Sequence, residues 1–306
     1  MKTKKTIRII ILFLAVMVFN LTGCKKEEDP DTSSLQQLSK DQGLVETSSN
    51  DILNEINDVL SSGSDKNFKG LPCNVTIDSS SVVNDTINYS ITFNGANCSN
   101  TYTRYGNATV KKNINTSWGT TETKVIVNYI NIDITKTATE KTVILNGMRT
   151  FENLTGDYLF NLGTSVNSVS HKITGQLEVE FEDNTTVSWS VNRKRTFTGA
   201  PGELVVTNAG LGSADSYSNL VWWGTNRQSE LFYTETTQEV VHKQICDWKP
   251  TSGIILHRVP SANKSATITF GYDNDNQPIS GNNCPVKLKL DWEKDDFSGT
   301  VFLLLP

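Results

Sequence analysis

The sequence predicts an all-β fold, in which a long antiparallel meander forms a sandwich or half-barrel and carries one N-terminal helix. Two observations lead to this prediction. Alternating apolar and polar residues, the pattern of a strand with one solvent-facing side, recur along most of the 306-residue chain. One earlier stretch, residues 34–66, has the apolar spacing of a helix instead. Taken in order, the chain divides into a leader, a tether, this helix and the β domain.

Residues 1–23 predict a secretory signal peptide. Four basic residues between positions 2 and 8 precede the unbroken apolar run 9–19. That run is too short to span a membrane as a stop-transfer helix. The closing residues Leu21-Thr22-Gly23-Cys24 resemble the lipobox of bacterial lipoproteins. The resemblance implies that Cys24 becomes the mature N-terminus and carries two or three acyl chains, and stable anchoring requires more than one.

Residues 24–33 predict a charged tether behind the lipidated cysteine. Charge in this place resembles the export tag of Bacteroidota-type surface lipoproteins, which favours display on the cell surface over the periplasmic face. Without residues 1–23, which hold four basic residues and no acid, the 28 Lys and Arg fall to 24 against 33 acids, a net charge of −9. This balance argues against a nucleic-acid partner and against electrostatic adhesion to anionic lipid.

Residues 34–66 predict the N-terminal helical segment. Apolar residues recur at helical spacing from Leu35 to Leu60. Either one long helix forms, or two helices are broken around Gly43 or Ser48-Ser49, with Asn50 as the N-cap of the second. In both cases we expect the apolar stripe to pack on the sheet.

Residues 67–306 predict the antiparallel β domain. One hairpin can be placed in register, because the strands around Val179 and Trp189 each alternate. A three-residue loop at 184–186 would pair Phe181 with Trp189 and keep the apolar side chains on one face. The last strand, 301–305, is apolar on both faces, which predicts a central or covered position rather than a bare edge.

Four cysteines remain after lipidation of Cys24, and they predict disulfides in an oxidising compartment. We favour Cys73–Cys98 and Cys246–Cys284 among the three pairings, since each closes a local loop around a strand-like segment. No C-x-x-C spacing occurs and the histidines are scattered, so no metal site is predicted.

The order of these features resembles outer-membrane surface lipoproteins of the Bacteroidota type, with a lipobox and an all-β secreted domain. The residues that carry the resemblance, besides Cys24, are Cys98, Arg104-Tyr105-Gly106, Arg193, Arg195, Thr225-Asn226-Arg227, Cys246 and Ser252-Gly253. The chain departs from the pattern at Tyr105, where a small or polar residue is expected. The resemblance implies an address and a fold and carries no activity.

No catalytic or cofactor-binding residue is predicted, because no recognised catalytic or phosphate-binding motif occurs. The histidines His171, His242 and His257 stand alone on strand-like segments. The glutamates Glu178, Glu180 and Glu182 alternate along one strand, which is typical of a solvated face. Residues 273–276 predict a polar hairpin tip, since Pro278 and Cys284 stand where a calcium loop has Gly and Glu.

Trp222 and Trp223 form the most suggestive aromatic cluster. Adjacent residues of a strand face opposite ways, so at most one of the two belongs to the core. An exposed Trp beside Asn226 and Arg227 would suit sugar stacking or a protein contact. The alternative is that the second Trp is covered by the N-terminal helix.

These observations favour a membrane-anchored, surface-displayed lipoprotein that acts as a binding or structural module for glycan or protein partners. The membrane is its first partner, through the lipid. Two alternatives stay open: an extracellular hydrolase of the glycoside type, with paired carboxylates, and a half-barrel that binds lipid in an apolar cavity.

Overall fold

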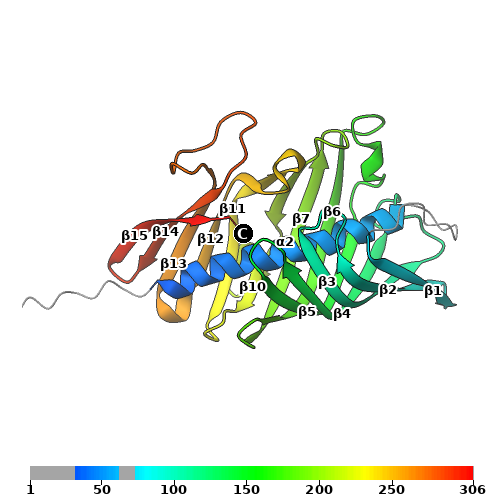
Figure 1. The fold of residues 1–306 in the computed structure, drawn as a ribbon, viewed down its shortest axis with the longest axis horizontal. Helices are drawn as coiled ribbons and strands as arrows, with labels where there is room; N and C mark the ends of the chain where they lie inside the picture. The colour runs from blue at the N-terminus through cyan, green and yellow to red at the C-terminus, as the bar shows by residue number, and fades with distance from the viewer. Residues whose placement is uncertain (1–31, 62–72, 306) are drawn as a thin grey trace, which may run out of the picture. The chain divides into compact units, whose positions relative to one another are not determined.

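The computed structural model describes residues 32–61 and 73–305 (Figure 1). They belong to one compact unit, Thr32–Pro306. The predictions for the signal peptide, for Cys24 and for the tether up to residue 31 lie outside the described residues. Within the described ranges, no helix combines the length and the apolar character needed to cross a membrane.

The described chain forms one α-helix followed by strands and three short 3-10 turns. The helix is α2 (Ser33–Ser61). The strands are β1 (Val75–Val83), β2 (Thr86–Ala96), β3 (Tyr102–Asn113), β4 (Lys124–Lys136), β5 (Lys141–Asn153), β6 (Ser168–Phe181), β7 (Thr186–Thr198), β8 (Val205–Gly210), β9 (Gly212–Ala214), β10 (Tyr217–Thr225), β11 (Leu231–Lys243), β12 (Pro250–Val259), β13 (Lys264–Tyr272), β14 (Lys287–Lys294) and β15 (Phe297–Leu304).

The strands make a single antiparallel sheet in which nearly every strand pairs with the next one along the chain. The exception is the middle of the sheet, where β8 and β10 both lie between β7 and β11, each paired with a different part of these two strands. Figure 1 shows the sheet curving around α2, which crosses the strands on the concave side. The predicted all-β meander with an N-terminal helix is therefore confirmed, and its sheet has the curvature of a half-barrel.

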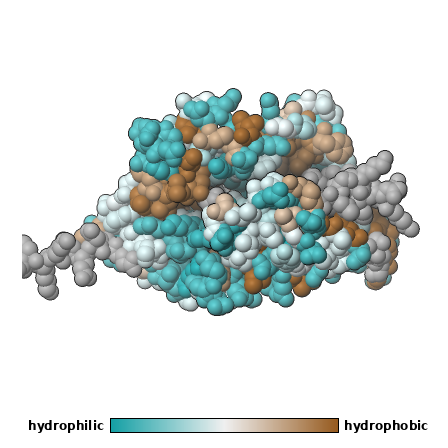
Figure 2. Space-filling model, in the orientation of Figure 1, coloured by the Kyte–Doolittle hydropathy of each residue, from teal (hydrophilic) through white to brown (hydrophobic). Residues whose placement is uncertain are grey.

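The core lies between α2 and the concave face. The strands alternate as predicted: in β7, Val187, Trp189 and Val191 are buried and the residues between them are not. The helix contributes its apolar stripe to the same core cluster, through Leu35, Leu38, Leu44, Val45, Ile52, Leu53 and Ile56. Figure 2 shows this helix-bearing face, where hydrophobic surface occurs in separate patches among hydrophilic atoms.

The helix is continuous, so the first of the two predicted arrangements, one long helix, is the one that forms. Gly43 and Ser48-Ser49 lie inside it. Asn50 does not act as an N-cap, because its Nδ2 donates to the Glu46 carboxylate one turn earlier at 2.9 Å. Side-chain packing on the sheet, rather than local propensity, supports this length.

Charged side chains also fasten α2 to the sheet. Three acids of the helix form ion pairs with three arginines whose side chains are at most 10 % exposed. These pairs are Asp41–Arg227, Glu46–Arg193 and Glu55–Arg104. They lie along the helix in the order in which it passes over the strands, and they therefore fix its register on the sheet.

Both predicted disulfides are confirmed. Cys73 is bonded to Cys98, across 25 positions of the chain, and Cys246 to Cys284, across 38. Closing loops of these lengths in the unfolded chain contributes roughly 3–4 kcal/mol each on the chain-entropy model.

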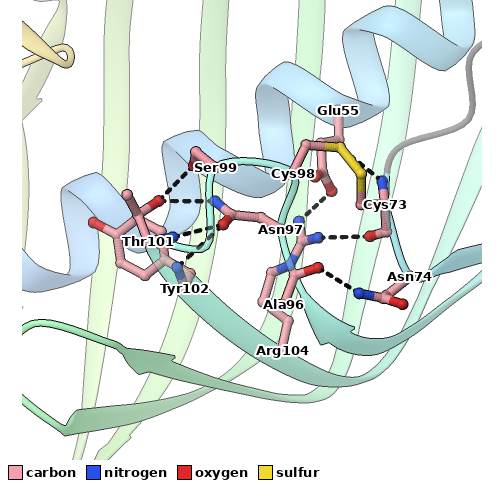
Figure 3. Close-up of a disulfide and its surroundings, with 10 residues drawn as sticks. All are labelled: Glu55, Cys73, Asn74, Ala96, Asn97, Cys98, Ser99, Thr101, Tyr102 and Arg104. Carbon is pink, nitrogen blue, oxygen red and sulfur yellow. Dashed lines mark hydrogen bonds and ion pairs between the residues drawn. A yellow bond between two sulfur atoms is a disulfide. The ribbon is translucent and has the colours of Figure 1, made fainter.

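The first disulfide lies beside the C-terminal part of the helix (Figure 3). Arg104 of β3 forms an ion pair with Glu55 of α2, and its second terminal nitrogen donates to the backbone oxygen of Cys73 at 3.3 Å. The Asn97 side chain closes the adjoining loop by accepting from the backbone nitrogen of Thr101 at 2.9 Å. One buried arginine thus joins the helix, the disulfide and the sheet.

The predicted register of the β6–β7 hairpin is wrong, because the residue opposite Trp189 lies four positions before the predicted Phe181. Leu177 lies opposite Trp189 and Val179 opposite Val187, and the loop is 182–184. The loop has three residues, as predicted, but turn chemistry places it earlier. Asn184 adopts a left-handed φ of 62°, and the backbone nitrogen of Thr185 donates to the side chain of Asp183 at 2.9 Å.

The prediction for the last strand is also wrong. Among the described strands β15 pairs only with β14, so it forms an edge of the sheet. Leu303 is buried, but Leu304 is 69 % exposed. Val301 and Leu305 pack against the core on one face of β15, and on the other face Phe302 meets the ring of Tyr272 with ring centres 5.3 Å apart.

Candidate functional site

The convex face of the sheet, opposite α2, carries a hollow of about 750 Å³. It lies where β5, β6 and β7 run beside Trp223 of β10. Its lining is Gly147, Met148, Thr174, Gly175, Gln176, Glu178, Ser188, Ser190, Val191, Asn192 and Trp223. This volume lies within the range that is usual for small-ligand sites.

Strand register brings the central lining residues into one row. Met148 of β5 is opposite Gln176 of β6, Gln176 is opposite Ser190 of β7, and Ser190 is opposite Trp223 of β10. Residues far apart in the sequence therefore meet across four strands.

Two glycines shape the sheet at the hollow. Gly147 and Gly175 have φ values of 114° and 146°, which side chains with a Cβ rarely adopt. A Cβ built on Gly175 would overlap the carbonyl oxygen of Met148 and lie 2.8 Å from the Cα of Arg149. The close approach of β5 and β6 therefore requires glycine here.

The aromatic part of the lining is Trp223. Its six-membered ring lies against Gly212 of β9, where a Cβ would come within 2.6 Å of the ring. Leu211, just before β9, is 46 % exposed, and Met148 at the opposite end of the row is 51 % exposed. The hollow thus combines an indole ring with exposed apolar side chains at its margins.

The polar part consists of amides, hydroxyls and one carboxylate. Gln176 donates from Nε2 to the Ser188 hydroxyl at 2.6 Å. Asn192 donates from Nδ2 to the backbone oxygen of Leu211 at 3.3 Å, while its buried Oδ1 has no hydrogen-bond partner among the described residues. Glu178 is exposed. Donors and acceptors of β6 and β7 therefore line the hollow beside the indole ring.

The structure does not bring the four predicted contact residues to one surface. Trp222 faces the concave side and is 3 % exposed, whereas Trp223 faces the convex hollow. Asn226 is buried in the β10–β11 turn, where its Oδ1 accepts from two backbone nitrogens. Arg227 binds Asp41 of the helix at 2.7 Å. Asn226 and Arg227 thus hold the turn and the helix in place.

The three glutamates of β6 do not share one site. Glu178 lines the hollow, opposite Ser188. Glu180 is opposite Thr186, outside the lining. Glu182 lies in the turn, with its carboxylate 3.9 Å from Arg227. Only one of the predicted carboxylates therefore reaches the hollow.

The histidines are buried on the concave side of the sheet. Burial lowers the pKa of His171 and of His257 to about 3 and also lowers the pKa of His242. His257 lies 2.9 Å from the Thr234 hydroxyl, which also binds Gln42 of the helix. The histidines are thus neutral at neutral pH and serve packing.

The polar hairpin tip at 273–276 is arranged around a lysine. Asp273 accepts from the backbone nitrogens of Asp275 and Gln277, and Lys287 donates to Asn274 and Asn276. Across the part of the chain that the structure describes, no group of three or more His, Cys, Asp or Glu side chains gathers in a way that could hold a metal ion.

Comparison with known proteins identifies no relative of this chain. No protein-family model matches the chain, and no curated protein and no solved structure is significantly similar to it. The functional argument therefore depends on the residues and their geometry alone.

Proposed function

We propose that this protein is a lipid-anchored outer-membrane lipoprotein, displayed on the cell surface, that binds carbohydrate in the convex hollow around Trp223. The observation that supports the binding site is the row from Met148 to Trp223 and its polar surroundings. The lipobox-like residues 21–24 support the anchor.

Carbohydrate is the ligand class whose chemistry matches this lining best. A pyranose ring has an apolar C–H face and a rim of hydroxyl groups. Trp223 and Met148 offer apolar contact, and Gln176, Asn192 and Glu178 offer both donors and acceptors. The Oδ1 of Asn192 is buried without a partner among the described residues, so a ligand hydroxyl that donates to it would gain a hydrogen bond.

The other candidate functions have less support. A lipid ligand would need the concave face, where the helix side chains already form the core with the sheet. A retaining or inverting glycosidase needs two carboxyl groups about 5 Å or about 6.5–9.5 Å apart, and Glu178 is the one carboxylate in the lining. A protein partner typically covers about 20–30 residues on each side, about twice the number that line the hollow.

A screen separates these classes. We would apply residues 25–306, which include the whole compact unit Thr32–Pro306, to a glycan array and to a pool of chromogenic glycosides and peptides. Binding without turnover is the expected result. Turnover of a glycoside would replace the proposal by the hydrolase, and the absence of any glycan signal would contradict carbohydrate binding.

The anchor is tested separately in cells. Globomycin, which blocks removal of lipoprotein signal peptides, should cause an unprocessed precursor to accumulate. Cys24→Ala should abolish incorporation of labelled palmitate into the protein, because the residue that accepts the lipid is lost. Normal processing under globomycin, or undiminished palmitate incorporation by Cys24→Ala, would refute lipidation. Protease digestion of intact cells then decides between surface display and the periplasmic face.

A further inference from the structure

Two arginines are buried together beneath α2, on the side of the sheet opposite the hollow. Arg149 of β5 is 0 % exposed and Arg193 of β7 is 1 % exposed. Both guanidinium carbons lie over the ring of Trp222, at 5.0 and 5.7 Å from its centre. Two like charges therefore share one indole ring inside the core.

The partners of these arginines are unevenly distributed. Arg193 forms an ion pair with Glu46 and donates to Asn50 at 3.1 Å. Arg149 has no hydrogen-bond partner among the described residues for any of its three side-chain nitrogens. The guanidinium carbon of Arg149 also lies over the ring of Tyr129, 5.9 Å from its centre, and the Tyr129 hydroxyl has no partner at hydrogen-bonding geometry within the described chain.

The local charges do not cancel. Glu46 is the acid that attracts Arg149, and it already serves Arg193. A third arginine, Arg195, is 6 % exposed two residues further along β7. Burial lowers the pKa of Arg149 to about 10 and that of Arg195 to about 9, so both remain charged at neutral pH. A buried charge without a counter-charge is strongly unfavourable, because it loses its hydration and gains no attraction to an opposite charge in return.

We propose that a small monovalent anion of the halide class binds at Arg149 between α2 and the sheet, with the Nε of Arg193 and the hydroxyl of Tyr129 as further donors. The donor set is made of unpaired N–H and O–H groups, which suits an acceptor-only ligand. The full burial of Arg149 favours an ion of atomic size over a carboxylate or phosphate. This site is independent of the proposed carbohydrate site.

Anomalous diffraction locates such an ion directly. Crystals of residues 25–306 would be grown in methanesulfonate, a monovalent anion of larger size, and soaked in sodium bromide. We expect an anomalous peak within hydrogen-bonding distance of Arg149. A water molecule or no density at that place, with bromide at surface positions only, would show an adventitious ion only and would overturn the proposal.

Thermal unfolding gives a second test in solution. Replacing methanesulfonate by chloride at constant ionic strength should raise the midpoint of unfolding of the wild type by about 2–4 °C, because the ion binds the folded state alone. Arg149→Met should abolish this shift. Arg258→Met, which removes an arginine with a 39 % exposed side chain from the convex face, should retain it. An equal shift in both variants would overturn the site, and if Arg149→Met does not fold, the diffraction experiment decides.

Discussion

Glu46→Ala is expected to lower the free energy of unfolding by about 3–5 kcal/mol, because it leaves the guanidinium of Arg193 buried without its acid. The measurement is urea unfolding of residues 25–306 followed by tryptophan fluorescence. Glu46→Gln is the matched variant: it keeps the shape and one acceptor and should cost less. A Glu46→Ala variant as stable as the wild type would show that this ion pair does not hold the helix.

The same carboxylate should make stability depend on pH. Burial alone would raise the pKa of Glu46, but attraction to Arg193 and the hydrogen bond from it outweigh burial and lower the pKa from 4.5 to about 2. Since the folded value lies below the unfolded one, the contribution is complete above about pH 4.5 and is lost as the pH falls towards 2. It amounts to about 3 kcal/mol. The wild type should therefore lose more stability than Glu46→Gln over this range, and parallel curves would contradict the assignment.

Gly175→Ala is expected to lower the free energy of unfolding by about 3 kcal/mol or more. The residue has a φ of 146°, and its new Cβ would overlap the carbonyl oxygen of Met148 on the neighbouring strand. The backbones of β5 and β6 would have to move apart, since no flexible side-chain end is available to give way. Urea unfolding measures the loss.

Gly202→Ala separates the two causes of this loss. Gly202 also has a positive φ, of 99°, but a Cβ there would meet nothing within 4 Å. The free energy of unfolding of Gly202→Ala should therefore fall only by the share that comes from backbone conformation, about 1–2 kcal/mol. Equal losses at the two glycines would show that the close approach of β5 and β6 is not the reason for Gly175.

Much of the fold can be predicted from the sequence, because a strand with one buried face has apolar residues at every second position. Val187, Trp189 and Val191 are buried in the structure for that reason. The two disulfides follow from local loops. The hairpin register does not follow, because the apolar faces are kept by any shift of an even number of residues. Only the turn-forming Asp183-Asn184 distinguishes these registers.

The arginines of the concave face are harder to predict, although one signal exists. Arg193 and Arg195 continue the buried alternation of β7, at positions where apolar side chains are expected. The acid that pairs with Arg193 is Glu46 of the helix, 147 residues earlier, and no local pattern connects the two.

The hollow could not be predicted, because Met148, Gln176, Ser190 and Trp223 become neighbours only through the register of four strands. Each residue alone resembles an ordinary solvent-facing position. Adjacent-residue geometry did predict that Trp222 and Trp223 point to opposite sides, and the structure confirms this.

Calorimetric titration of a glycan identified on the array tests the central claim most directly. Trp223→Ala should weaken its binding by about 2 kcal/mol, or about 30-fold, because the indole ring offers the largest apolar contact in the hollow. Tyr105→Ala removes an aromatic side chain that is 51 % exposed on β3, outside the hollow, and should bind as the wild type does. Undiminished binding by Trp223→Ala, or an equal loss in both variants, would contradict carbohydrate binding at this site.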